Sequence, residues 1–151
     1  MTSRVTRSAG ETEDVAAALA GGFAGGEVVL LSGELGAGKT VFVQGMARGL
    51  GFDGSVSSKS FVLLGEYPGR LTLYHADLYR LEDPQQVQDL ALDEISSGGV
   101  LVVEWPERAG GAVLPDEHLH VEFAVISENV RELRADPTGD RAKQIIAALS
   151  D

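Results

Sequence analysis

The sequence predicts an α/β fold, a three-layer sandwich in which a mixed, mainly parallel sheet is flanked by helices. Two short apolar runs, VVLL at 28–31 and VLVV at 100–103, have the composition of strands buried on both faces in a parallel sheet. A helical pattern lies between them, because Phe42, Met46 and Leu50 recur every four residues. Strands that alternate with helices predict one sheet with helices on both faces.

The chain begins with signals for a short strand and a helix. Residues 4–7 predict an edge strand. Ser8 and Glu11 have the spacing of a capping box, which predicts a helix from there to about Ala20. Glycines at 21–22 and 25–26 end this helix before the first buried strand.

The middle of the chain adds a hairpin and a crossover. Residues 61–67 and 71–75 flank Pro68-Gly69, which predicts two antiparallel strands joined by a turn. Asp83-Pro84 is a helix start, with a side-chain cap followed by proline at the first helical position. The helix that follows supplies the connection to the second buried strand.

The last third of the chain predicts a second hairpin and a final helix. Residues 118–126 and 130–134 have the alternation of paired strands. Residues 140–149 form an amphipathic helical pattern. At 151 residues with 44% hydrophobic side chains, we expect one domain spanning 1–151.

Residues 33–40, GELGAGKT, fit the phosphate-loop pattern G-x-x-x-x-G-K-[ST] between a strand and a helix. Such a loop presents backbone N–H groups and the positive end of the helix dipole to a phosphate. Lys39 is expected to reach the β- and γ-phosphates of ATP, and Thr40 to place its hydroxyl on Mg²⁺. The fold is therefore expected to be P-loop NTPase-like. The nucleotide-binding residues expected here are Gly33, Glu34, Leu35, Gly36, Ala37, Gly38, Lys39, Thr40 and Val41.

Two carboxylates are expected to complete the site. Ligands of open α/β sheets lie beyond the carboxyl ends of the strands, and Glu104 ends a buried strand there. It is the leading acid, holding Mg²⁺ or positioning water, although a solvated strand-end carboxylate is the alternative. Asp77 follows the strand 71–75 and is the second candidate, with a turn-capping Asp as its alternative. The expected catalytic residues are thus Glu104, Asp77 and Lys39, and the expected metal ligands Thr40 and Glu104.

The bulk composition limits the class of protein. The formal net charge of −11, from 12 Lys and Arg against 23 Asp and Glu, opposes a broad grip on a nucleic-acid backbone. The chain has no cysteine, which excludes disulfides and thiolate metal sites. With neither an 18-residue apolar run nor a signal-peptide pattern, we expect a cytoplasmic protein that is not attached to a membrane.

Four motifs in this order resemble one family. The phosphate loop, Ser58-Lys59-Ser60-Phe61, the segment 75–81 (HADLYRL) and Glu104-Trp105-Pro106 are similar to those of the TsaE family, also called YjeE, of bacterial tRNA threonylcarbamoyladenosine biosynthesis ATPases. The similarity covers nearly the whole chain. The segment 75–81 and the E-W-P motif are the specific part, since phosphate loops are widespread.

The resemblance implies a slow, Mg²⁺-dependent ATPase that is stimulated by partner proteins. In the family these partners are TsaB and TsaD, which place threonylcarbamoyl on adenosine 37 of tRNA. The resemblance implies contact with tRNA only through that complex, and we expect a monomer in isolation. It also implies roles near the nucleotide for Glu11, Thr12, Ser60, Trp105 and Arg131.

One motif departs from the family pattern. The family loop usually contains S-P-T, and here Lys59 replaces the proline and Ser60 the threonine. Ser60 keeps a hydroxyl, whereas Lys59 adds a positive charge and frees the backbone φ angle. We hypothesise a shifted ATP affinity. A Lys59→Pro variant with unchanged ATP affinity and hydrolysis would contradict this.

Two other functions remain open from the sequence. A small-molecule kinase would use the same loop, but no arginine-bearing lid insertion of the kind that kinases close over their substrates is visible. A nucleotide-gated binding module with negligible turnover would use ATP only to set a conformation.

Overall fold

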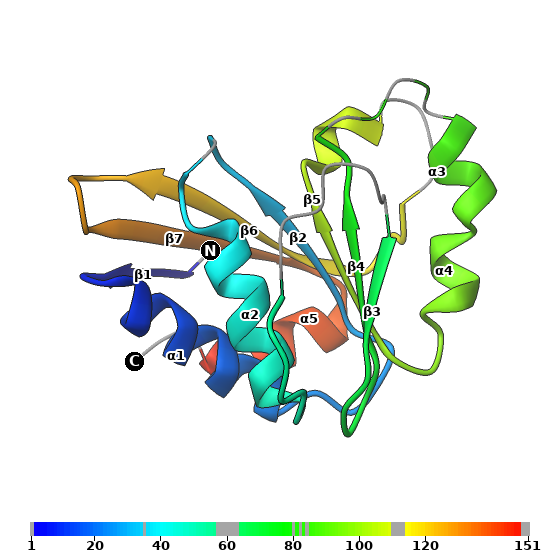
Figure 1. Ribbon diagram of the computed structural model, residues 1–151, viewed down its shortest axis with the longest axis horizontal. Helices are drawn as coiled ribbons and strands as arrows, with labels where there is room; N and C mark the ends of the chain where they lie inside the picture. Colours follow the sequence, from blue (N-terminus) through cyan, green and yellow to red (C-terminus); the bar gives the residue numbers. More distant parts are fainter. Residues whose placement is uncertain are drawn as a thin grey trace.

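The protein is built around one seven-stranded sheet, with the strand order β1-β7-β6-β2-β5-β4-β3 (Figure 1). The computed structural model describes residues 2–34, 36–56, 64–79, 81, 83, 85–109 and 114–148. The sequence-based expectations for Leu35, Lys59 and Ser60 lie outside the described residues. The strands are β1 (Thr2–Thr6), β2 (Val28–Ser32), β3 (Leu64–Tyr67), β4 (Leu73–Asp77), β5 (Val100–Glu104), β6 (His118–Val125) and β7 (Arg131–Thr138).

The centre of the sheet is parallel and its edges are antiparallel. β2 pairs in parallel with both β5 and β6, and β4 pairs in parallel with β5. The pairs β3–β4, β6–β7 and β1–β7 are antiparallel. This confirms the mixed, mainly parallel sheet, in which the two apolar runs form the adjacent central strands β2 and β5.

Helices cover both faces of the sheet, as expected for a three-layer sandwich (Figure 1). One face carries α1 (Ala9–Gly21), α2 (Lys39–Gly49) and α5 (Asp140–Ile145), whose apolar side chains share a core with Leu31 and Val102. The other face carries α3 (Gln85–Leu90) and α4 (Leu92–Ile95), and there Leu92 packs with Leu30 and Val103. Alternate residues of β2 and β5 therefore enter opposite cores.

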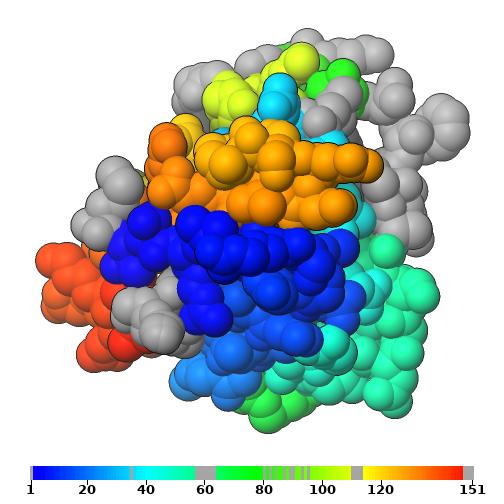
Figure 2. All heavy atoms as spheres, turned by 90° about the vertical axis from the view of Figure 1, so that its left-hand side faces the viewer, coloured from blue at the N-terminus to red at the C-terminus, as the bar shows by residue number. Residues whose placement is uncertain are grey.

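The terminal hairpin is longer than the sequence predicted. β7 runs to Thr138, although the predicted strand ended at 134. Pro137 pairs with Leu119 of β6, whereas the pairing of β7 with β1 stops at Ala135. Pro137 therefore lies where β7 is an edge strand, the position at which a sheet accepts proline. Figure 2 shows β1 lying between this orange hairpin and α1.

The first helix has the predicted cap. The Ser8 side chain accepts a hydrogen bond from the Glu11 N–H at 3.0 Å, and the Glu11 carboxylate accepts one from the Arg7 N–H at 2.8 Å. At the other end, the guanidinium of Arg70 donates to the carbonyls of Ala20 and Phe23. Side chains thus cap both ends of α1, where they bond backbone N–H and carbonyl groups that have no partner within a helix.

The final helix is shorter than its predicted range. α5 ends at Ile145, and a 3₁₀ turn, η2 (Ile146–Ala148), continues it. A second 3₁₀ turn, η1 (Pro106–Ala109), follows β5. In the described part of the chain, no helix has both the length and the apolar character needed to cross a membrane.

Candidate functional site

The phosphate loop connects β2 to α2 and leaves the start of α2 open to a ligand. Gly38 is the N-cap residue of this 11-residue helix, with φ +108°, and no side chain caps the helix there. Left-handed φ favours glycine at this point. An anion above the loop would meet the first-turn amides of α2 and the positive end of its dipole.

Gly33 fixes how closely the loop packs on the sheet. A Cβ at this position would lie 2.9 Å from the carbonyl oxygen of Phe123 in β6, and the φ angle is +144°. Both the space and the backbone conformation therefore require glycine. Because Gly33 has no side chain, the start of the loop can pack directly against the backbone of β6.

Lys39, at the start of α2, folds back over the loop. Its ammonium group donates to the carbonyl of Gly33 and lies 3.5 Å from the centre of the Trp105 ring. The residue is only 4% exposed. Burial lowers the pKa of Lys39, and the negative charges of Glu104, Glu107 and Asp77 oppose that change.

Asp77 and Glu104 end adjacent parallel strands and are register partners. Glu104 is 3% exposed, and its Oε2 lies 2.5 Å from Nε2 of His75. Asp77 accepts a hydrogen bond from the Tyr79 N–H at 3.1 Å. Burial raises the pKa of Asp77, and the negative charge of Glu104 raises it further. The hydrogen bond from the Tyr79 N–H and the charges of His75 and Lys39 act in the opposite direction and lower it. Asp77 therefore forms the local turn and also belongs to the site.

A cavity of about 240 Å³ lies between the phosphate loop and these carboxylates. It is lined by Gly36, Gly38, Lys39, Thr40, Val41, Asp77, Tyr79, Glu104 and Trp105. The side chains in its lining that could bind a metal offer the Thr40 hydroxyl and the carboxylates of Asp77 and Glu104, and oxygen donors suit Mg²⁺. Among the described residues there is no group of three His, Asp or Glu side chains that could hold a metal ion. The donor set fits a Mg²⁺ ion that keeps waters and shares phosphate oxygens, as this ion usually does.

A second cavity, of about 150 Å³, lies on the other side of the same loop. Ser8, Ala9 and Thr12 of the α1 start line it, together with Glu128, Asn129 and Arg131 of the β6–β7 hairpin. Gly36, Gly38 and Val41 border both cavities. One extended ligand could therefore occupy both cavities across the loop.

Arg131 supports the phosphate loop from the side of this second cavity. Its Nε donates to the Ala37 carbonyl at 3.0 Å, and one Nη donates to the Gly36 carbonyl at 3.2 Å. The other Nη donates to carbonyls of the β6–β7 turn, including that of Ser127 at 2.9 Å. Because these bonds occupy the guanidinium, its role in the structure is to hold the loop.

The structure brings most of the expected site residues together, but not all. Glu11 borders neither cavity; its carboxylate caps α1 and lines a groove beside Arg4. Glu34 is exposed on the loop. Leu35 and Ser60 lie outside the described residues.

Sequence reasoning gave no role to His75 or Tyr79. His75 is buried behind Glu104, and the Tyr79 ring packs on Trp105 with 4.9 Å between ring centres. The signal was the two-residue alternation of His75 and Asp77 in the strand, which places both on one face. Ser8, Glu128 and Asn129 gave no comparable signal, because their position depends on how α1 and the last hairpin pack.

Known proteins are similar to this chain in sequence and in fold. Residues 6–133 match the family model described as threonylcarbamoyl adenosine biosynthesis protein TsaE. A Bacillus subtilis protein named tRNA threonylcarbamoyladenosine biosynthesis protein TsaE is 39% identical over 142 residues, 93% of this chain and 88% of the relative. A protein of the same name from Treponema pallidum is 44% identical over 109 residues, 72% of this chain and 80% of the relative.

A solved structure agrees with these sequence matches. The crystal structure of Bacillus subtilis YdiB superposes with a TM-score of 0.80 at 33% identity, covering 98% of this chain and 93% of that one. The P-loop NTPase-like fold expected from the sequence is thereby confirmed. Family model, relatives and fold agree, and this chain belongs to the TsaE family of tRNA threonylcarbamoyladenosine biosynthesis proteins.

Proposed function

We propose that this protein hydrolyses Mg²⁺-ATP bound across the phosphate loop. The triphosphate lies over the first-turn amides of α2, and the nucleoside lies in the cavity bordered by Thr12 and Arg131. The γ-phosphate then reaches the cavity that contains Asp77 and Glu104. The two cavities on either side of one open helix N-terminus support this placement.

The observation that carries the proposal is the position of Glu104 opposite the start of α2. β2 and β5 are adjacent and parallel, with Leu31 and Glu104 in register, so the loop after one strand faces the carboxylate that ends the other. Parallel strands of an α/β sheet bring ligand groups together at this edge. Lys39 supplies the positive charge between loop and carboxylate.

Thr40 and Glu104 are the residues that would hold Mg²⁺ in this site. The ion supplies charge neutralisation at the transferring phosphoryl group. Lys39 would leave the Gly33 carbonyl to bind phosphate oxygens, since a charged phosphate is the stronger acceptor. Asp77 or Glu104 would accept a hydrogen bond from the attacking water and orient it.

Measurement of phosphate release without any small-molecule acceptor tests this function. We expect ATP hydrolysis that requires Mg²⁺ and falls sharply in a Glu104→Gln variant. Release that occurs only with an added acceptor would instead indicate a kinase. No release under any condition, with ATP still bound, would indicate a binding module.

We further propose that this ATPase acts in the cytoplasm with TsaB and TsaD in the modification of adenosine 37 of tRNA. The names of its relatives support the pathway, and the net charge of −11 favours contact with tRNA through partners. In a reaction reconstituted with TsaB and TsaD, we expect many rounds of tRNA modification when the wild-type protein is present. We do not expect them when it is left out or replaced by an inactive variant. A Lys39→Ala variant that supports the same yield would contradict an ATP-dependent role.

A further inference from the structure

His75 holds one oxygen of the Glu104 carboxylate from behind the site. Its Nε2 lies 2.5 Å from Glu104 Oε2, and the two residues are 5% and 3% exposed. A carboxylate has only acceptor sites, so the imidazole donates through Nε2–H. Within the described part of the chain, no hydrogen bond to Glu104 Oε1 is found, and Glu104 borders the cavity.

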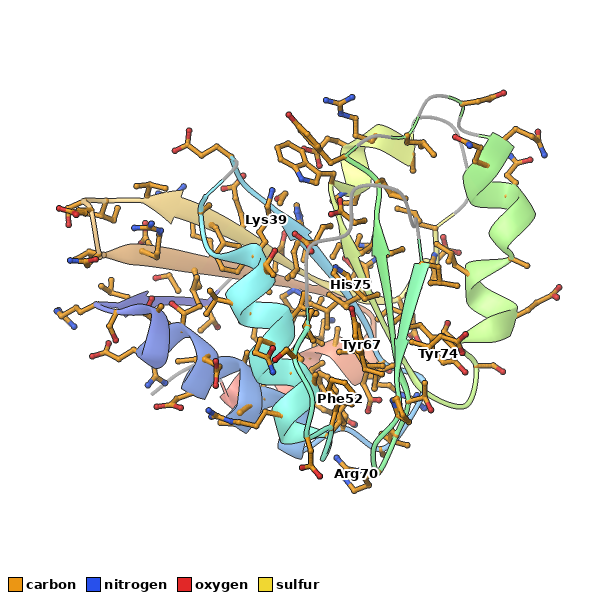
Figure 3. All side chains as sticks on the ribbon, viewed as in Figure 1. Lys39, Phe52, Tyr67, Arg70, Tyr74 and His75 are labelled. Atoms are coloured by element: carbon orange, nitrogen blue, oxygen red, sulfur yellow. The ribbon has the colours of Figure 1, made fainter. Side chains whose placement is uncertain are left out.

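The imidazole itself cannot touch a ligand in that cavity. His75 is absent from the cavity lining and lies deeper along β4 than Asp77. The Tyr67 ring lies 6.3 Å from the imidazole, and the Phe52 ring packs on Tyr67 at 5.1 Å. Figure 3 shows Lys39, His75, Tyr67 and Phe52 in succession from the start of α2 toward its end. These rings limit how far the imidazole can move.

We propose that His75 is a positioning residue, which fixes Glu104 by Oε2 so that Oε1 is presented to the Mg²⁺ bound with ATP. This rests on the proposed function. Partners that bind the outer side of a ligating group orient it, and their loss typically lowers metal affinity or activity by about 10–100-fold. Without His75, a buried carboxylate would lose its hydrogen bond and adopt other rotamers.

Three variants separate positioning from packing. His75→Leu removes the donor, and His75→Gln keeps an N–H group close to the place of Nε2. His118→Leu is the matched control, because His118 is a half-buried imidazole whose Nδ1 donates to the Pro115 carbonyl at the other end of the sheet. Trp105, the only tryptophan, borders the cavity, and its fluorescence is expected to report binding.

The experiment titrates Mg²⁺ at fixed ATP and, separately, ATP in EDTA. In His75→Leu we expect the half-saturating Mg²⁺ concentration to rise about 10-fold or more, with ATP affinity in EDTA within about twofold of wild type. His75→Gln should recover most of the Mg²⁺ response, and His118→Leu should equal wild type. In hydrolysis assays kcat should fall in His75→Leu while the KM for ATP is retained.

Two outcomes overturn the inference. One is a wild-type Mg²⁺ dependence in folded His75→Leu, which would show that Glu104 needs no outer support. The other is a His75→Gln variant that is impaired as much as His75→Leu, which would assign the effect to packing. Wild-type protein that binds no Mg²⁺-ATP would overturn the proposed function itself, and that result is read before the variants are compared.

Discussion

The ammonium group of Lys39 lies 3.5 Å from the centre of the Trp105 ring, and Trp105 has a left-handed backbone with φ +59°. A left-handed φ is uncommon for a residue with a bulky side chain. It turns the chain directly after Glu104, and the Trp105 N–H bonds the Leu31 carbonyl at 3.2 Å. In this structure the indole thus covers the lysine that is expected to bind phosphate.

This contact predicts a fluorescence signal for nucleotide binding. ATP should draw the Lys39 ammonium toward its phosphates, which changes the surroundings of the indole. Titration of the wild-type protein with ATP should therefore change Trp105 emission in a saturable way. A Lys39→Met variant should start from a different emission intensity. Unchanged emission at ATP concentrations that calorimetry shows to be saturating would contradict this geometry.

Lys39→Ala should weaken ATP binding by about 10-fold or more, because charge-assisted bonds to phosphate are worth about 1.5–3 kcal/mol. Calorimetry in Mg²⁺ measures the loss. Lys143→Ala removes an exposed lysine of α5 and should bind like wild type. Equal affinities of the two variants would show that the phosphates lie elsewhere.

Glu104→Gln should reduce turnover far more than ATP binding. The amide oxygen can still accept from His75, but the negative charge for metal or water is lost. We expect kcat to fall by about 10²–10⁴, the range for loss of a positioned acid or base. Single-turnover phosphate release measures this, with Glu66→Gln on the exposed side of β3 as the control. Comparable losses in both variants would remove Glu104 from the mechanism.

Arg131→Lys should loosen the phosphate loop although it keeps the charge. A lysine cannot replace the guanidinium bonds to Gly36, Ala37 and the hairpin turn at once. We expect weaker ATP binding and a loss of about 1–2 kcal/mol in the free energy of unfolding. Arg134→Lys, an exposed neighbour on β7, provides the comparison in urea unfolding. Stability equal to that of Arg134→Lys would show that the loop needs no such support.

Asp77→Asn should stabilise the nucleotide-free protein at neutral pH. Burial raises the folded-state pKa of Asp77, so its ionised form costs stability above that pKa. At neutral pH the variant avoids this cost and can still accept from the Tyr79 N–H. As the pH falls below the ordinary aspartate pKa, the wild-type carboxyl is protonated in both states and the difference should vanish.

Thermal unfolding from neutral to acidic pH measures the Asp77 effect, with Asp136→Asn on β7 as the exposed control. If Asp77 orients the attacking water as proposed, hydrolysis should fall in Asp77→Asn although stability rises. An Asp77→Asn variant that is less stable than wild type at neutral pH would show that the ionised Asp77 carboxylate does not destabilise the folded protein.

The sequence predicted the features that depend on local pattern. The two apolar runs, the Ser8 cap and the phosphate loop each need only neighbouring residues to be recognised. The end of β7 was predicted too early, at residue 134. The extension includes Pro137, and a strand accepts proline there only because that part of β7 lies at a sheet edge, which the sequence does not show.

The site residues likewise include some that local sequence pattern predicts and some that it does not. The strand-end positions of Glu104 and Asp77 predicted that they would meet at the loop. The second cavity could not be predicted, because Asn129 and Thr12 come together only through the packing of α1 on the last hairpin. The Ser8 cap was predicted correctly, but the Glu11 carboxylate accepts from the Arg7 N–H and not from the Ser8 N–H of a capping box. Glu11 thus serves the start of α1 and borders neither cavity.

The bonds from Arg131 to residues 36 and 37 have a consequence for the order of synthesis. β2, which precedes the loop, has β5 and β6 as its neighbours, and these strands begin only at Val100 and His118. During synthesis the phosphate-loop sequence therefore emerges from the ribosome long before the strands and the arginine that shape it. Such distant pairings form slowly. The nascent chain should gain affinity for ATP only after its last hairpin has emerged.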